Sequence, residues 1–165
     1  MDTKKTLVVY FSHSGNTRAV ARTVAALTGG NEFRIETVKS YPEGYTETTE
    51  VAKEELRLKA RPELKGLQPR MEDYNLIIVA YPNWWGTMPM AVFTFLESYD
   101  LAGKTILPLC THEGSRLGHS EADLRQMCPQ SQVLKGLAVQ GNRVAEAEAD
   151  LKAWLRESQI VEEEI

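Results

Sequence analysis

The sequence predicts an α/β fold: a three-layer sandwich with a five-stranded parallel sheet between two layers of helices. Apolar runs alternate with amphipathic segments along the chain, a pattern typical of parallel sheets with helices on both faces. Residues 76–81 and 105–110 are almost continuously apolar, as strands buried on both faces are. Five strands and one glycine-poor loop after the first strand favour strand order 2-1-3-4-5 over a six-stranded dinucleotide fold.

In the first half of the chain, residues 6–11 are rich in β-branched and aromatic side chains and predict the first strand. Residues 17–27 place Val20, Val24 and Leu27 on one face of a helix. Residues 33–38 alternate between apolar and polar side chains, which predicts a second strand at the sheet edge. The long connection 39–68 contains a helical segment, 47–61, that ends at Arg61-Pro62.

The second half repeats the alternation. Residues 76–81 and 105–110 are the third and fourth strands, although Pro108 is unusual in a central strand. Residues 133–139 predict a fifth strand that Gly136 weakens. The helices are expected at 89–99, 120–127 and 143–157, of which the first and last carry clear apolar faces.

Length and composition exclude several classes of protein. A chain of 165 residues fits a single domain, 1–165. Its 19 basic and 23 acidic residues give a formal net charge of −4, which argues against a nucleic-acid partner. Two cysteines suit a reducing, cytoplasmic setting and have no metal-ligand spacing, so no metal is expected. The N-terminal apolar run is too short for a signal segment or a membrane span.

The loop after the first strand carries the strongest functional signal. This first loop, residues 12–17, joins a strand to a helix N-terminus and consists of Ser12, His13, Ser14, Gly15, Asn16 and Thr17. Helix capping needs one such polar side chain, and the loop has several. Backbone N–H groups, hydroxyls and the positive end of the helix can together hold a phosphate without Lys or Arg. The loop has neither a Walker A sequence nor a three-glycine dinucleotide fingerprint.

Two further loops lie at the same predicted sheet edge. The second loop, residues 82–89, contains Pro82, Asn83, Trp84, Trp85 and Gly86. Adjacent tryptophans in an extended loop tend to point in opposite directions, so one can close the core while the other faces a flat ligand. The third loop, residues 111–118, begins with Thr111, His112, Glu113, Gly114 and Ser115 and can hydrogen-bond the edge of a ring. No nucleophilic triad is present, and no catalytic residue is assigned.

Taken together, these loops resemble those of flavodoxins, and in particular a branch of short bacterial flavodoxin-like proteins. The resemblance extends over nearly the whole chain in the expected order. It implies FMN as the cofactor, with the 5′-phosphate in the first loop, the flavin ring against the second and the pyrimidine side against the third. It also implies that the loop containing Gly86 reaches flavin N5. The third loop has no Tyr or Trp, which leaves one flavin face open.

The resemblance implies electron transfer to redox partner proteins or to a small electron acceptor. One alternative is an NAD(P)H-dependent FMN reductase acting on quinones or similar acceptors, and another is a non-redox ligand-binding domain. His13 and His112 can bond phosphate or flavin, can move a proton, or can be ordinary surface histidines. Neither the oligomeric state nor the ring that stacks on the flavin follows from the sequence.

Overall fold

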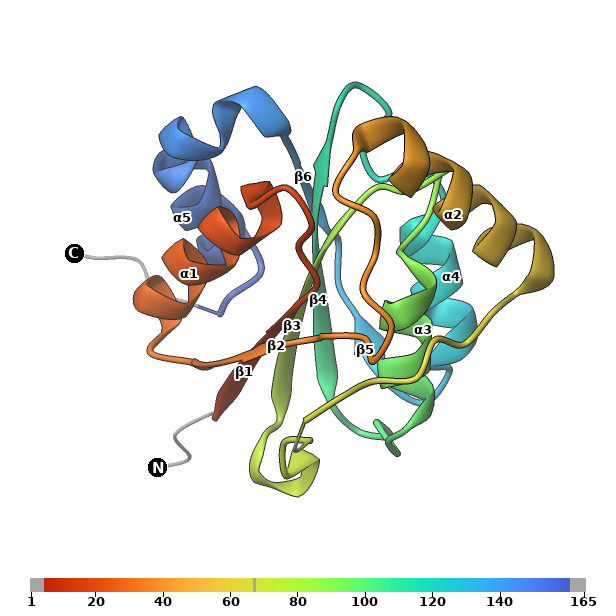
Figure 1. The fold of residues 1–165 in the computed structure, drawn as a ribbon. Coiled ribbons are helices and arrows are strands. Elements are labelled where there is room, and N and C mark those ends of the chain that lie inside the picture. Colours follow the sequence, from red (N-terminus) through yellow and green to blue (C-terminus); the bar gives the residue numbers. More distant parts are fainter. Residues whose placement is uncertain (1–4, 67, 161–165) are drawn as a thin grey trace.

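The structure, a computed structural model, describes residues 5–66 and 68–160. Five neighbouring strands are parallel and follow the order β2-β1-β3-β4-β5, which confirms the predicted topology (Figure 1). The bounds are β1 Thr6–Tyr10, β2 Asn31–Arg34, β3 Leu76–Pro82, β4 Thr105–His112 and β5 Gln132–Val133, with β6, Leu137–Gln140, also paired to β4. The direct neighbours β1 and β3 place the topological switch point between them.

Helices cover both faces of the sheet, as the alternation predicts. Helices α1 (Asn16–Thr28) and α5 (Glu148–Glu157) lie on one side, and α2 (Tyr45–Leu58), α3 (Met90–Glu97) and α4 (Ser120–Met127) on the other (Figure 1). Short 3₁₀ turns span Met71–Asp73 and Gly141–Glu146. None of the helices in the described ranges is long and apolar enough to cross a membrane.

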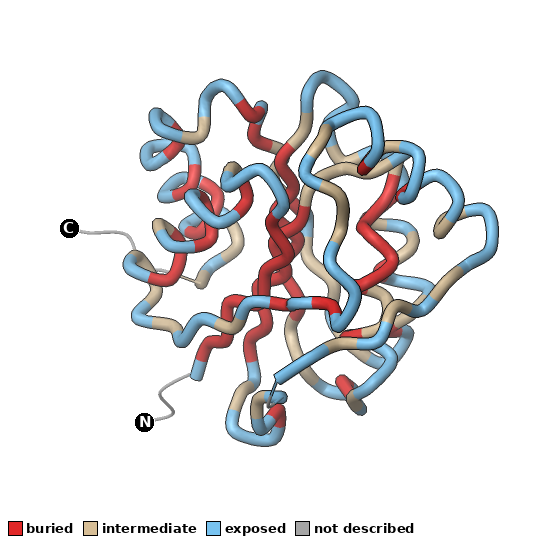
Figure 2. The backbone as a smooth tube through the Cα atoms, viewed as in Figure 1, coloured by how far each residue is buried: buried red, intermediate tan, exposed pale blue. Residues whose placement is uncertain are grey.

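Successive strand residues point to opposite faces and build two apolar cores. Leu7 and Val9 of β1 pack toward α3 and α4, while Val8 and Tyr10 pack toward α1 and α5. The inner strands are buried along their length (Figure 2). The buried sheet therefore fixes the positions of the loops at its carboxyl edge.

The fifth predicted strand is split into β5 and β6. Ile106 pairs with Val133, and Leu109 pairs with Leu137. An advance of three residues along β4 therefore corresponds to an advance of four residues from β5 to β6. The extra residue is accommodated beside Pro108, which has no N–H to donate to a neighbour. A Cβ on Gly136 would lie 2.9 Å from the Pro108 carbonyl oxygen. The close approach explains the glycine that weakened the sequence pattern.

Other boundaries also differ from the sequence prediction. The helix expected at 47–61 is α2, Tyr45–Leu58, and it ends before Arg61 because Lys59 adopts the left-handed conformation at φ +52°. The second strand was expected at 33–38 but occupies Asn31–Arg34. After Ile35 donates to the Tyr10 carbonyl, the chain leaves the sheet, and Thr37 pairs antiparallel with Leu64. The closing helix, expected at 143–157, is divided into a 3₁₀ turn and α5. The early end of the second strand reflects tertiary pairing that local periodicity does not encode.

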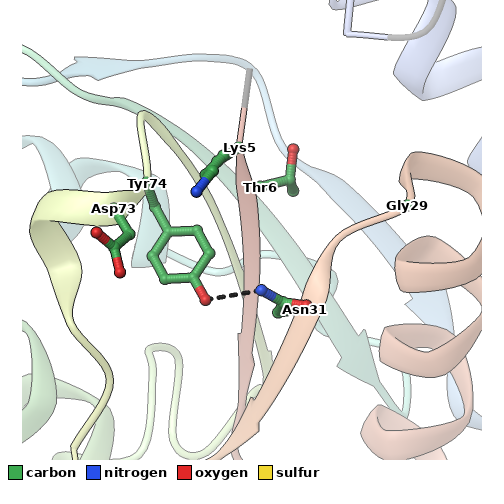
Figure 3. Close-up of a pocket in the computed structure, with 6 residues that line it drawn as sticks. All are labelled: Lys5, Thr6, Gly29, Asn31, Asp73 and Tyr74. Atoms are coloured by element: carbon green, nitrogen blue, oxygen red, sulfur yellow. Dashed lines mark hydrogen bonds between the residues drawn. The ribbon is translucent and has the colours of Figure 1, made fainter. Parts of the chain in front are cut away.

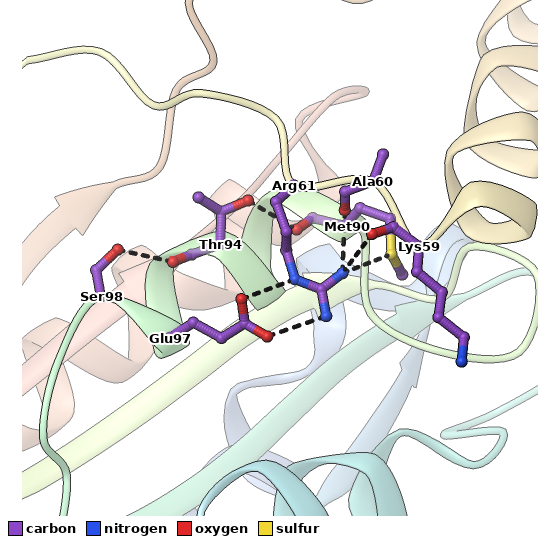
Figure 4. A network of polar contacts seen from close by, with 7 residues as sticks. All are labelled: Lys59, Ala60, Arg61, Met90, Thr94, Glu97 and Ser98. Carbon is purple, nitrogen blue, oxygen red and sulfur yellow. Dashed lines mark hydrogen bonds and ion pairs between the residues drawn. The ribbon is translucent and has the colours of Figure 1, made fainter.

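An arginine ties the long connection between β2 and β3 to α3. Arg61 donates two hydrogen bonds to the Glu97 carboxylate, at 2.9 and 3.0 Å, and others to the carbonyls of Lys59 and Ala60 (Figure 4). Its guanidinium also lies over the ring of Phe93. This bidentate pair fixes the C-terminal end of α2, and with it the helix that borders the second loop.

Candidate functional site

The first loop forms a concave turn at the N-terminus of α1. Gly15 has φ +99°, a conformation that glycine adopts without a steric penalty. The Ser12 hydroxyl oxygen accepts the N–H groups of Gly15 and Arg18, both at 3.2 Å. Within the described residues, the N–H groups of Ser14, Asn16 and Thr17 have no hydrogen-bond acceptor. One residue therefore caps the helix, and the remaining donors are available to an anion.

The remaining side chains of this loop have different surroundings. His13 and Ser14 are exposed, and Asn16 is half-buried. His13 Nε2 lies 2.8 Å from the Pro42 carbonyl oxygen. Thr17 is only 2% exposed, and its hydroxyl lies 2.7 Å from that of Thr111 in β4. The loop thus offers backbone donors, with Thr17 bonded to the start of the third loop.

A cation that the sequence analysis did not consider lies beside this loop. Arg34, at the end of β2, donates to the Ser12 carbonyl oxygen at 3.1 Å. Its charge adds to the positive end of α1. A carboxylate also lies beside the loop, because a Cβ on Gly141 would meet both Glu113 Oε1 at 2.6 Å and Asn16 Nδ2 at 2.7 Å. The first loop, the third loop and the 3₁₀ turn at Gly141 therefore meet at one point.

The second loop closes on itself in a tight turn. Trp84 and Thr87 form an antiparallel bridge, and the two residues between them, Trp85 and Gly86, have φ +58° and +92°. Positive φ at both central positions is the type I′ pattern. Asn83 Oδ1 accepts the Gly86 N–H at 2.8 Å. A tryptophan in the left-handed region is strained, and such strain concentrates at functional sites.

The two tryptophans have different environments. Trp84 is half-buried, and its ring meets those of Phe11 and Tyr41 edge to face, each with 5.2 Å between ring centroids. Trp85 is 47% exposed. Its indole N–H donates to the Thr49 carbonyl of α2 at 2.9 Å, and Lys53 Nζ lies 5.4 Å from its ring centroid. Trp84 is the packed ring, and Trp85 is a fixed ring with an accessible surface.

The third loop packs against the second. Gly118 has φ +56°, and a Cβ there would lie 2.8 Å from the Gly86 carbonyl carbon. His112 Nδ1 accepts the Gly114 N–H at 2.9 Å, so this nitrogen carries no proton. Burial, with a contribution from Arg116, lowers the pKa of His112. Residues 113–116 are exposed. His112 is therefore a neutral side chain with Nε2 as its donor.

A further cluster was missing from the sequence analysis. His119 Nδ1 lies 2.9 Å from Asp123 Oδ2, which also accepts the Thr87 hydroxyl. The His119 backbone N–H donates to the Gly86 carbonyl at 2.8 Å. His119 and Asp123 are four residues apart at the start of a predicted helix, and this spacing was the available signal for their contact. The contact with Gly86 depends on tertiary structure.

Outside these loops, the structure contains a polar hollow of about 240 Å³. It is lined by Lys5, Thr6, Gly29, Asn31, Asp73 and Tyr74, and the Tyr74 hydroxyl accepts from the Asn31 side chain at 2.9 Å (Figure 3). This hollow lies at the amino ends of β1 and β3, whereas ligands of open α/β sheets bind at the carboxyl ends. The three loops remain the candidate site. The described residues contain no His, Cys, Asp and Glu group that could hold a metal.

With this geometry established, comparison with known proteins gives the family. A family model described as flavodoxin matches residues 5–158. The chain belongs to the flavodoxin family. A comparison with curated proteins gives no match.

Solved structures share the flavodoxin fold with this chain. A candidate flavoprotein from Bacteroides eggerthii is 28% identical, with a TM-score of 0.83 over 94% of this chain and 98% of its own. A flavoprotein in complex with FMN from Lactobacillus acidophilus is 19% identical, with a TM-score of 0.71 over 89% of this chain and 99% of its own. An FMN-bound flavodoxin from Fusobacterium nucleatum is 12% identical, with a TM-score of 0.63 over 95% and 98% of the two chains.

The donor set of this flavodoxin fits a phosphomonoester attached to a flat ring. Unbonded backbone donors at Ser14, Asn16 and Thr17 suit a phosphate. The accessible ring of Trp85 suits a flat aromatic group. The first loop has no acidic side chain of its own, and the carboxylate beside it, Glu113, belongs to the third loop.

Proposed function

We propose that this flavodoxin binds FMN and transfers electrons between redox partners. The observation that carries the proposal is the first loop, where several backbone N–H groups without acceptors converge at the N-terminus of α1. The FMN-bound flavoprotein and flavodoxin described above support the same cofactor. When bound, FMN supplies the capacity to accept and pass on electrons singly or in pairs.

Each loop has a separate task in this proposal. In the first loop Ser12, His13, Ser14, Gly15, Asn16 and Thr17 surround the 5′-phosphate, and Arg34 adds positive charge behind it. In the second loop Pro82, Asn83, Trp84, Trp85 and Gly86 border the flavin ring, with Trp85 as the stacking ring. In the third loop Thr111, His112, Glu113, Gly114 and Ser115 flank the pyrimidine side, where His112 Nε2–H is a neutral donor.

The packed ring of Trp84 has a different role from Trp85. With Phe11 and Tyr41 it fills the space beneath the second loop and excludes water from it. The Tyr41 hydroxyl donates to Glu55 of α2 at 2.7 Å, and burial raises the pKa values of both Tyr41 and Glu55. This cluster connects α2 to the switch point of the sheet.

A second function, reduction of quinones or similar acceptors with NAD(P)H, is favoured by the open third loop. Residues 113–116 are exposed and include no aromatic side chain to cover a second flavin face. An azoreductase from Bacillus anthracis and a candidate quinone reductase from Klebsiella pneumoniae share the fold, at 13% identity each. A small acceptor has access to a flavin with one uncovered face.

Steady-state kinetics separates the two functions. The FMN-loaded protein is mixed with NADH or NADPH, with and without a quinone, and nucleotide oxidation is followed by absorbance. A carrier oxidises the nucleotide slowly on its own and needs a reductase to turn over. Rapid nucleotide oxidation that depends on the quinone would replace the carrier by the reductase. A protein that retains no FMN after loading would contradict both.

A further inference from the structure

We propose that His119, held by Asp123, is the group that takes up a proton when the bound flavin is reduced. The inference rests on the proposed FMN site and extends it, since His119 belongs to none of the three loops.

The tautomer of His119 follows from its partner. Asp123 Oδ2 lies 2.9 Å from His119 Nδ1, and an ionised carboxylate only accepts hydrogen bonds. Nδ1 therefore carries the proton, and Nε2 is the nitrogen that exchanges. The Thr87 hydroxyl donates to the same carboxylate oxygen and holds it in place. Thr87 orients the Asp123 carboxylate, and the carboxylate orients the imidazole of His119. This arrangement is expected of an acid or base that the protein holds in position.

The exchanging nitrogen faces the second loop. A Cβ on Gly86 would lie 3.1 Å from His119 Nε2, so the imidazole covers the α-carbon of that residue. The His119 backbone N–H also holds the Gly86 carbonyl at 2.8 Å. The side chain of His119 is 61% exposed and that of Asp123 is 25% exposed. The imidazole thus lies largely in solvent, with Nε2 beside the turn that borders the flavin ring in the proposed site.

Among the titratable groups of the second loop, the third loop and α4, His119 is the one to which we assign proton uptake. Residues 82–89 of the second loop include no titratable side chain. The third loop contributes His112, Glu113 and Arg116; His112 uses Nδ1 to accept the Gly114 N–H. In α4, Asp123 is the direct partner, and Glu121 accepts the Gly136 N–H at 2.7 Å. Imidazole is the side chain that ordinarily changes charge between pH 5 and 8.

One electron supplied by a redox partner would add one negative charge at the FMN that the three loops hold. A proton from solvent binds to Nε2, and the resulting imidazolium stays paired with the Asp123 carboxylate. The positive charge of the imidazolium stabilises the added negative charge, and it therefore raises the reduction potential of the bound FMN. The coupling makes that potential depend on pH in the range where an imidazole ordinarily changes charge.

The test measures the midpoint potential of the FMN-loaded protein between pH 5 and 8.5. We expect the plot for the unaltered protein to bend within this range and the bend to be absent in His119→Asn. Asparagine places its side-chain N–H where Nδ1 lies, so it can still donate to Asp123, but it does not titrate. Both proteins keep the backbone bond to Gly86. Asp123→Asn should move the bend to lower pH, because the imidazolium loses its carboxylate.

Two results separate the inference from the proposed function. A bend of the same size and position in His119→Asn would overturn the role of His119 while leaving FMN binding intact. Failure of the unaltered protein to bind FMN would overturn both. A measurement on the cofactor-free protein adds a direct readout: ¹⁵N NMR of the imidazoles should give the Nδ1–H tautomer for His119 and the Nε2–H tautomer for His112. The opposite tautomer at His119 would contradict the geometry on which the inference depends.

Discussion

The hydroxyl groups of Thr17 and Thr111 lie 2.7 Å apart inside the protein, although 94 positions separate the two residues. Thr17 lies in the first turn of α1, and Thr111 lies near the end of β4. The bond therefore joins the first and third loops, and each hydroxyl satisfies the other in a place that water does not reach. Both residues are less than 5% exposed.

This pair predicts non-additive stability. Thr17→Val or Thr111→Val alone leaves one buried hydroxyl without its partner, and should cost about 1–3 kcal/mol of unfolding free energy. The double variant removes both polar groups at nearly constant shape and should be closer to the unaltered protein than the sum of the two losses. Urea unfolding of all four proteins measures this. Simple additivity would show that the two hydroxyls do not stabilise each other.

The two tryptophans should respond oppositely to truncation. Trp84→Ala removes a ring packed on Phe11 and Tyr41, so it should destabilise the fold by about 3 kcal/mol. Trp85→Ala should leave stability nearly unchanged, because the ring is 47% exposed and alanine keeps the same strained backbone. It should weaken FMN binding at least tenfold, about 1.4 kcal/mol. Thermal melting and FMN titration of both variants check the assignment. Unchanged FMN affinity in Trp85→Ala would show that Trp85 does not stack on the flavin ring.

Much of the fold could be predicted because the signals are local. Buried runs such as 76–81 and the amphipathic helices specify their own structure, and the 120–127 helix has the predicted bounds. The split of the fifth strand could not be predicted, because it depends on the register of Gly136 beside Pro108. Nor could the short second strand, because Asn31 and Glu32 carry no apolar pattern.

Some features of the candidate site, like those of the fold, could be predicted from the sequence and others could not. Loops rich in Ser, Asn, Gly and Trp were visible because residue type itself indicates phosphate or ring binding. His119 and Arg34 were not, because their roles depend on contacts with Gly86 and with the Ser12 carbonyl. The different environments of Trp84 and Trp85 were likewise settled by packing against Phe11 and Tyr41, which are distant in sequence.

Gly118 should tolerate no side chain. A Cβ there meets the Gly86 carbonyl group, and the positive φ adds backbone strain. Gly118→Ala should therefore destabilise the protein by more than Gly103→Ala, a matched control with φ +79° and open space around its α-carbon. The control should cost about 1 kcal/mol. Urea unfolding of both variants tests this, and equal losses would mean that the contact between the second and third loops has no energetic weight.

His112 should make stability depend on pH. Burial and Arg116 lower its pKa below the ordinary value, so the folded protein prefers the neutral imidazole. This contribution is fully present above the unfolded pKa of about 6.5 and is lost as the pH falls through the lowered folded value. Melting temperatures between pH 7.5 and 5 should fall more in the unaltered protein than in His112→Gln. A ¹H NMR titration giving His112 a pKa at or above 6.5 would contradict this prediction.

The proposal that the first loop holds the phosphate of FMN is tested most directly by comparing FMN with riboflavin. The cofactor-free protein is titrated with each, and quenching of tryptophan fluorescence reports binding. FMN should bind at least tenfold more tightly, because without a phosphate the loop donors lose their acceptor. Asn16→Ala should reduce the difference in affinity between FMN and riboflavin. The control variant Asn31→Ala, at the opposite edge of the sheet, should leave that difference unchanged. Equal affinities for FMN and riboflavin in the unaltered protein would contradict the account.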